Sequence, residues 1–127
     1  MRLRKLAAVQ DVGAIINEIG HQGQIEGSVV QGVGYALMEE LSVDQGHITT
    51  ASFGDYKIPT ICDIPNMVTV NIRTTGPGPF EAKGIGETPI VPTAAAIANA
   101  VGDAIGAPIL QLPITPERVL EAMEAKG

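Results

Sequence analysis

Apolar residues recur at helical spacing in the segment GQIEGSVVQGVGYALMEEL, residues 23–41. Ile25, Val29 and Val33 lie four positions apart, which predicts a helix with one apolar face. The same segment contains interior glycines, each of which costs about 1 kcal/mol relative to alanine in an exposed helix. A helix of this kind either packs closely against another backbone or borders a ligand. Close packing is the commoner explanation, and the pattern leaves both open.

Two further helices are indicated by different signals. Residues 88–106, TPIVPTAAAIANAVGDAIG, are rich in alanine, which predicts a helix that another element can approach closely. Near the C-terminus Thr115 precedes Pro116, so a capping residue is followed by the residue favoured at the first helical position. A short C-terminal helix is therefore expected to begin there.

Strands are expected where apolar and polar residues alternate. Residues 67–74, MVTVNIRT, alternate clearly, and residues 3–9, LRKLAAV, are a second candidate. A third candidate, GHITTASF at residues 46–53, follows a turn at residues 44–46. The sum is an α+β fold in which a small mixed sheet packs with two long helices and a short C-terminal helix. A length of 127 residues is suited to one domain, residues 1–127.

Two long segments are predicted to be loops. In DYKIPTICDIPNM, residues 55–67, two prolines exclude both a helix and a central strand. The other, TGPGPFEAKGIGETP at residues 75–89, is rich in glycine and proline. Loops of this length within compact domains are usually functional or disordered.

Composition narrows the classes of partner. The chain has eight basic and fourteen acidic residues, which give it a net charge of −6. This charge repels a phosphate backbone, so we expect no nucleic-acid partner. No segment approaches the roughly 18 consecutive apolar residues of a membrane span, so no membrane partner is expected. Cys62 is the single cysteine, which excludes an intrachain disulfide, and we expect it to be buried as a small apolar residue. The protein is expected to be cytoplasmic.

Familiar ligand motifs are absent from the sequence. Neither G-x-x-x-x-G-K-[ST] nor G-x-G-x-x-G occurs, which argues against a standard nucleotide-binding loop. His21 and His47 lie far apart without Cys or carboxylate at ligand spacing, so we expect two surface histidines and no zinc site held by the protein.

What remains is a set of polar residues next to glycines: Gln24, Glu26, Gln31, Lys83 and Glu87. Glycine lets a ligand approach main-chain groups without a β-carbon in the way. A glutamine can donate to and accept from a heterocycle, and a partly dehydrated carboxylate can act as a general base. This pattern favours a bound cofactor or substrate. Glycine turns beside a glutamate at a helix start would explain it equally well.

Five longer motifs occur in a fixed order: DVGAIIN, GQIEGSVVQGVGYALMEE, DYKIPTICDIPNM, GPGPFEAKGIGETP and LPITPERVLEAM. In this order they resemble the molybdenum hydroxylases of the xanthine dehydrogenase and aldehyde oxidase family. The similarity extends from about residue 9 to residue 123 and matches the C-terminal part of the large subunit, its last molybdopterin-binding subdomain. The earlier portion of that subunit, which lines most of the substrate pocket, lies outside the resemblance. Asn17-Glu18 stands where many relatives have Asn-Pro, at no residue with an assigned role.

The resemblance implies roles for individual residues. Glu87 matches the active-site glutamate of the family, the base that takes a proton from a hydroxyl group on molybdenum when an electron-poor carbon is hydroxylated. Gln24 matches the glutamine that hydrogen-bonds molybdopterin near the metal. The turn whose main chain borders the pterin matches four consecutive residues, Lys83, Gly84, Ile85 and Gly86.

The resemblance also implies cofactors and partners. The cofactor is molybdopterin, of which the cytosine dinucleotide form is common among bacterial relatives. Iron–sulfur clusters and FAD are expected only on partner subunits or domains, namely a 2Fe–2S subunit and a FAD subunit. The remaining molybdopterin-binding portion of the large subunit and a small-molecule substrate complete the list, and the isolated chain is expected to be inactive. The alternative is a non-catalytic domain of the same fold that forms a homo-oligomer through the surface otherwise covered by the missing portion.

Overall fold

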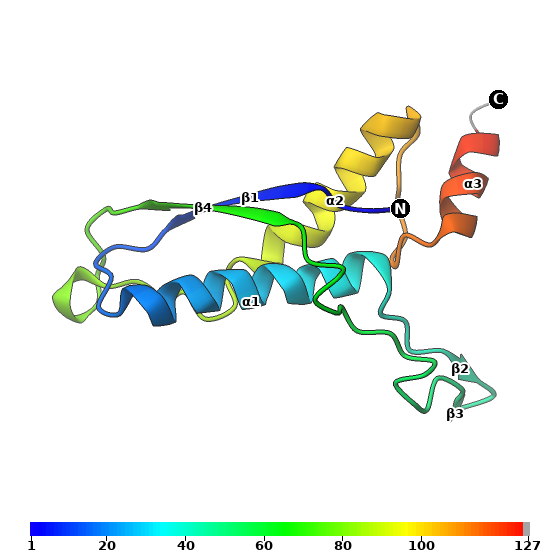
Figure 1. The fold of residues 1–127 in the computed structure, drawn as a ribbon, viewed down its shortest axis with the longest axis horizontal. Coiled ribbons are helices and arrows are strands. Elements are labelled where there is room, and N and C mark those ends of the chain that lie inside the picture. Colours follow the sequence, from blue (N-terminus) through cyan, green and yellow to red (C-terminus); the bar gives the residue numbers. More distant parts are fainter. Residues whose placement is uncertain (126–127) are drawn as a thin grey trace.

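The computed structural model describes residues 1–125 and is organised around two parallel strands joined by a long helix (Figure 1). Strand β1, Lys5–Asp11, pairs in parallel with strand β4, Asn66–Ile72, in a register that runs from Lys5 opposite Asn66 to Asp11 opposite Ile72. Helix α1, Glu18–Leu37, returns the chain along one face of this pair. Parallel strands require such a crossover, because a tight hairpin can join only antiparallel ones.

Helix α1 is longer at its start and shorter at its end than the apolar pattern predicts. Asn17 caps it, with Oδ1 accepting a hydrogen bond from the amide of Gly20 at 2.8 Å. The first turns contain glycine and little apolar surface, so the periodicity becomes visible only from Ile25 onward. The helix ends because the carbonyl of Gly34 accepts bonds from the amides of both Met38 and Glu39.

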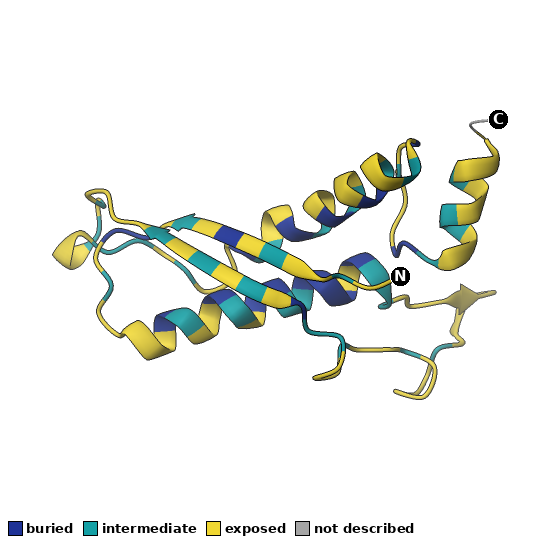
Figure 2. Ribbon diagram, turned by 45° about the horizontal axis from the view of Figure 1, so that its top comes forward, coloured by how far each residue is buried: buried dark blue, intermediate teal, exposed yellow. Residues whose placement is uncertain are grey.

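The core follows the apolar face of α1, which Figure 2 shows as a row of buried positions along the helix. Toward its start, Ile25 and Val29 pack against Ala8 of β1. Toward its end, Val33 and Ala36 join a second cluster with three residues from the C-terminal part of the chain, Ile97, Val101 and Ile114. The sheet and α2 therefore use successive halves of one helix face.

The two remaining helices confirm the sequence prediction. Helix α2, Ile90–Ile105, ends at Gly106, whose φ of 68° is the left-handed conformation that glycine adopts easily. Helix α3, Pro116–Glu124, begins after Thr115, whose Oγ1 accepts a hydrogen bond from the amide of Arg118. α3 has no buried residue within the described chain, and it is tied to the body by the amide of Ile114, which donates to the carbonyl of Ala36 at 2.6 Å.

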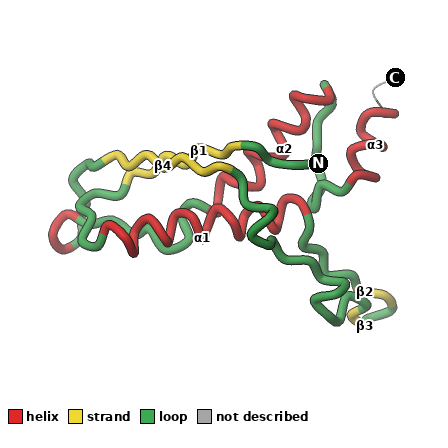
Figure 3. The backbone as a smooth tube through the Cα atoms, in the orientation of Figure 1, coloured by secondary structure: helices red, strands yellow, loops and turns green. Residues whose placement is uncertain are grey.

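Residues 38–65 form an arm that leaves the body beyond α1 and is mostly loop (Figures 1 and 3). Its tip is a hairpin of β2, Val43–Asp44, and β3, His47–Ile48, joined by the predicted turn, in which Gln45 and Gly46 both have positive φ. The predicted strand at 46–53 stops at Ile48. The parallel pair of β1 and β4 and the antiparallel pair of β2 and β3 form two separate sheets. The loop predicted for residues 55–67 is present up to residue 65. Cys62 is exposed in this loop, and the expectation that it is buried is wrong.

Candidate cofactor-binding site

The loop that follows β4 is anchored to the turn that follows β1. The amide of Lys83 donates to the carbonyl of Val12 at 3.1 Å, and the amide of Ala14 donates to the carbonyl of Glu81 at 3.2 Å. Gly13 between them has a φ of 65°, and a β-carbon there would lie 2.2 Å from the carbonyl oxygen of Glu81. Only glycine allows this approach, so the DVG turn fixes the start of the segment that contains Lys83.

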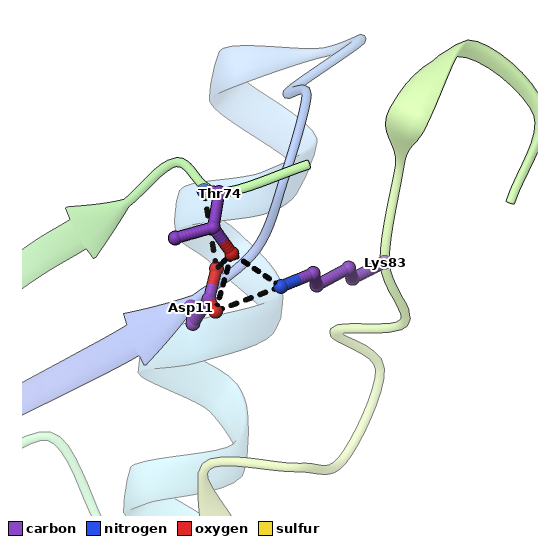
Figure 4. A network of polar contacts seen from close by, with 3 residues as sticks. All are labelled: Asp11, Thr74 and Lys83. Atoms are coloured by element: carbon purple, nitrogen blue, oxygen red, sulfur yellow. Dashed lines mark hydrogen bonds and ion pairs between the residues drawn. The ribbon is translucent and has the colours of Figure 1, made fainter. Parts of the chain in front are cut away.

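The side chain of Lys83 is held by a polar cluster at the ends of the two strands (Figure 4). Its Nζ lies 2.7 Å from Oδ2 of Asp11, and the hydroxyl of Thr74 donates to the same carboxylate. The hydrogen bond from Lys83, reinforced by those from Thr74, lowers the pKa of Asp11 to about 2. The positive charge of Lys83 is therefore balanced by the Asp11 carboxylate. Lys83 acts as a clamp that joins its own loop to the ends of β1 and β4.

Residues 84–87 lie against α1 through one apolar and one polar contact. The side chain of Ile85 packs on the cluster formed by Ala8, Ile25 and Val29. The hydroxyl of Ser28 lies 2.8 Å from the carbonyl oxygen of Gly86, and also 2.8 Å from the carbonyl oxygen one helical turn back along α1, that of residue 24. Sequence reasoning missed Ser28, although a small polar residue within the apolar row of a helix is the signal that could have revealed it.

Gln24, Lys83 and Ile85 line one shallow cavity of about 250 Å³ between α1, the DVG turn and the 82–85 segment. His21 lines it too and is buried, so its predicted surface position is wrong. Its Nε2 lies 3.2 Å from Oδ1 of Asn71 on β4, a partner that no sequence spacing reveals. His47 is exposed in the hairpin, as predicted.

Glu87 is not among the residues that line this cavity. It is exposed in the turn before α2, where its carbonyl accepts a hydrogen bond from the amide of Ile90 at 3.1 Å. Its main chain nevertheless follows directly on Gly86, which Ser28 fixes beside the helical turn of Gln24. The structure thus brings the main chain at residues 86–87 close to Gln24 and leaves the Glu87 carboxylate outside the cavity.

Several glycines at this place have no packing reason among the described residues 1–125. A β-carbon added to Gly84 or Gly86, or to Gly23 or Gly27 of α1, would meet no other atom within 4 Å. None of the four has the positive φ that requires glycine. They leave bare backbone next to the exposed amide of Gln24, which is the surface that a flat heterocycle with donors and acceptors at its edge can approach. The residues present therefore fit a pterin group.

Two absences concern the described residues 1–125. No group of three or more His, Cys, Asp and Glu side chains is placed there to hold a metal ion. No helix in the same range is long and apolar enough to cross a membrane.

Comparison with known proteins identifies the class. The family model for the molybdopterin cofactor-binding domain matches residues 1–65. The chain therefore belongs to this family, whose cofactor is molybdopterin. The putative xanthine dehydrogenase molybdenum-binding subunit XdhA of Escherichia coli K12 is 37% identical over 98% of the chain. The nicotine 6-hydroxylase large subunit of Paenarthrobacter nicotinovorans is 40% identical over 96% of it. These matches confirm the predicted relationship to the xanthine dehydrogenase and aldehyde oxidase family.

Solved structures confirm the fold and define its extent. Quinoline 2-oxidoreductase from Pseudomonas putida 86 superposes with a TM-score of 0.90 at 34% identity over 97% of the chain. Aldehyde oxidoreductase from Desulfovibrio gigas gives 0.87 at 36% identity over the same share. The chain covers only 16% and 14% of these proteins, and 17% of XdhA, so it spans about a sixth of the length of its relatives.

Proposed function

We propose that the chain is the part of a molybdenum-dependent hydroxylase that borders molybdopterin and supplies Glu87 as a general base. One observation carries this proposal. Ser28 holds Gly86, and with it the start of Glu87, beside the helical turn of Gln24, where the backbone is bare. The main chain that leads into Glu87, an amide that can bind a heterocycle and unobstructed glycine backbone therefore lie next to one another.

When bound, molybdopterin supplies the metal centre that accepts two electrons from the substrate. The Gln24 amide would hydrogen-bond the edge of the pterin, since it offers both a donor and an acceptor and is exposed. Gly84 and Gly86 would let the pterin approach their main chain closely. Ile85 and Ser28 would keep this segment on α1, so that binding requires little rearrangement of the chain.

Glu87 has the properties of a base that is available for reaction. Each of the three ion pairs among residues 1–125 uses another carboxylate, namely Asp11, Glu18 or Glu40. The carboxylate oxygens of Glu87 are thus free to take up a proton from the oxygen nucleophile that attacks an electron-poor carbon. Because the side chain is exposed here, a closed reaction site needs further walls, and we expect the isolated chain to be inactive.

Those walls and the path for electrons would come from partners. The chain matches about a sixth of its relatives, and one relative is subunit gamma of the 6-hydroxypseudooxynicotine dehydrogenase complex of Paenarthrobacter nicotinovorans. We propose the remaining molybdopterin-binding portion of a large subunit as the direct partner. A 2Fe–2S protein and a FAD protein would then remove the electrons, and the substrate would be a small molecule.

The decisive variant is Glu87→Gln in a complex that contains the rest of the large subunit and the electron-transfer subunits. Loss of a positioned general base lowers a rate by about 100- to 10,000-fold, so turnover of whichever purine, aldehyde or N-heterocycle the complex oxidises should fall by this factor. Molybdenum content and thermal stability should not change. Glu81→Gln is the matched control, because it removes an exposed carboxylate from the same loop. Normal turnover by the Glu87→Gln complex would show that this residue is not the base.

A further inference from the structure

The strand pair presents a row of aliphatic side chains on the side away from the helices of the chain. On β4, Thr69 and Asn71 face α1, where Thr69 Oγ1 donates to Oε1 of Gln22 at 2.8 Å and Asn71 bonds His21. The alternate residues point to the opposite side, since successive side chains of a strand leave opposite faces. After Asn66 at the start of the strand they are aliphatic: Val68, Val70 and Ile72, exposed to 37%, 47% and 48%.

Strand β1 continues this surface. Ala8 faces α1 and is buried, so its neighbours Ala7 and Val9 face outward. The register places Ala7 opposite Val68 and Val9 opposite Val70. The outer face of the sheet is defined here as these five residues, Ala7, Val9, Val68, Val70 and Ile72. The alternation of exposed residues along both strands is visible in Figure 2.

This arrangement leaves an aliphatic face exposed that a chain surrounded by water would gain from burying. A sheet with one wet face normally turns its apolar residues to the core and its polar ones outward. Here Thr69 and Asn71 of β4 are turned inward beside Met67, while three aliphatic side chains of the same strand remain outside. Parallel strands are almost always covered on both faces, and two strands alone have little independent stability. The outer face therefore has the character of a surface that another layer covers.

The ends of the outer face also resemble those of an interface. Lys5 and Asn66 form the pair at one end of the register, and Asp11 stands at the other end opposite Ile72. An aliphatic centre with polar residues at its margin is the usual arrangement of a protein–protein contact. The side chains of the centre call for an aliphatic partner surface.

We infer that the outer face is the docking surface for the remaining molybdopterin-binding portion of a large subunit, through an aliphatic layer of that portion. This inference rests on the assembly step of the proposed function. The relatives are about six times longer, yet quinoline 2-oxidoreductase has the same fold with a TM-score of 0.90 across 97% of the chain. The chain therefore keeps this sheet where most of the surrounding protein is additional.

The test compares two adjacent alanines. Ala7→Cys and Ala8→Cys are made separately in a Cys62→Ser background, in the isolated chain and in a chimera where the chain replaces the matching stretch of Escherichia coli XdhA. Maleimide labelling of each cysteine is followed by mass spectrometry, and each rate is normalised to that of the same variant in urea. In the isolated chain Ala7→Cys should react freely, and Ala8→Cys roughly tenfold or more slowly, because a buried thiol reacts only after local opening.

In the chimera both positions should react slowly. A chimera in which Ala7→Cys stays as reactive as in the isolated chain, either because the face is open or because the chain does not dock, overturns the inference. Slow labelling of Ala7→Cys in the isolated chain, with a dimer seen by light scattering, also overturns it and makes a second copy the occupant. Labelling needs neither cofactor nor turnover, so the outcome for Glu87→Gln does not affect this test.

Discussion

Helix α1 contains glycines of two different kinds. Where α1 crosses α2, a β-carbon on Gly32 would lie 2.6 Å from the β-carbon of Thr93, so the two helices meet at this glycine. Two turns earlier, Gly23 and Gly27 border open space. The sequence pattern offered close packing and a neighbouring ligand as alternatives, and one helix combines packed glycines, Gly32 and Gly34, with two unpacked ones. Only the unpacked ones indicate a group from outside the chain.

The loop before α2 repeats this contrast. Gly76 and Gly78 approach main-chain oxygens of residues 81 and 82 so closely that a β-carbon would lie within 2.7 Å of them. Gly84 and Gly86, a few residues later in the same loop, have free space around them. The first pair belongs to the turn that anchors the loop, and the second lies beside Gln24. Unpacked glycines from two distant parts of the sequence thus meet at the candidate cofactor site.

The largest stability effect is expected from Gly32→Ala. The new β-carbon would overlap the β-carbon of Thr93, which is bonded directly to the α2 backbone and cannot rotate away. Overpacking of this kind costs about 1–3 kcal/mol. Chemical denaturation of the isolated chain measures the loss of unfolding free energy. Equal or higher stability of the variant would mean that the two helices are not in close contact at this residue.

Gly27→Ala should shift stability in the opposite direction. The helix interior favours alanine over glycine by about 1 kcal/mol, and nothing within 4 Å of the new β-carbon opposes it. The same denaturation experiment should therefore give a higher midpoint for this variant than for the unmodified chain. A loss comparable to that of Gly32→Ala would contradict the distinction between packed and unpacked glycines.

The fold was largely predictable because its signals are local. The row Ile25, Val29, Val33 indicated α1, alternation indicated β4, and the Thr115-Pro116 pair marked the start of α3. The residue at which α1 begins was not predictable from periodicity, because Asn17 caps a first turn with little apolar surface.

The site was less accessible to sequence reasoning than the fold. Their neighbouring glycines and the resemblance to the family indicated Gln24 and the 83–87 segment, but not the contacts that join them. Ser28 reaches Gly86 across 58 positions, and His21 reaches Asn71 across 50, so neither contact has a local signal. The inward direction of the Thr69 and Asn71 side chains was also hidden, since alternation shows that a strand has two faces without showing which one the helix covers.

The smallest expected effect on stability comes from Asp11, whose ion pair with Lys83 clamps the loop before α2 to the end of β1. Since the pKa of Asp11 in the folded chain is about 2, below its usual value of about 4, the clamp contributes stability that is fully present above pH 4. That contribution is lost as the pH falls through about 2. Asp11→Asn should therefore lower the melting temperature slightly at neutral pH, and the difference from the unmodified chain should vanish between about pH 4 and pH 2.

Glu18→Gln is the matched control for this pH profile, because it removes the other strand-end ion pair, that of Glu18 with Arg73. Both side chains of that pair are more than half exposed, and exposed pairs contribute little, so this variant should follow the unmodified chain at every pH. A deficit of Asp11→Asn that persists undiminished at pH 2 would mean that the ionised carboxylate is not what holds Lys83. In that case the anchoring of the loop would rest on the main-chain bonds of Val12 and Ala14 alone.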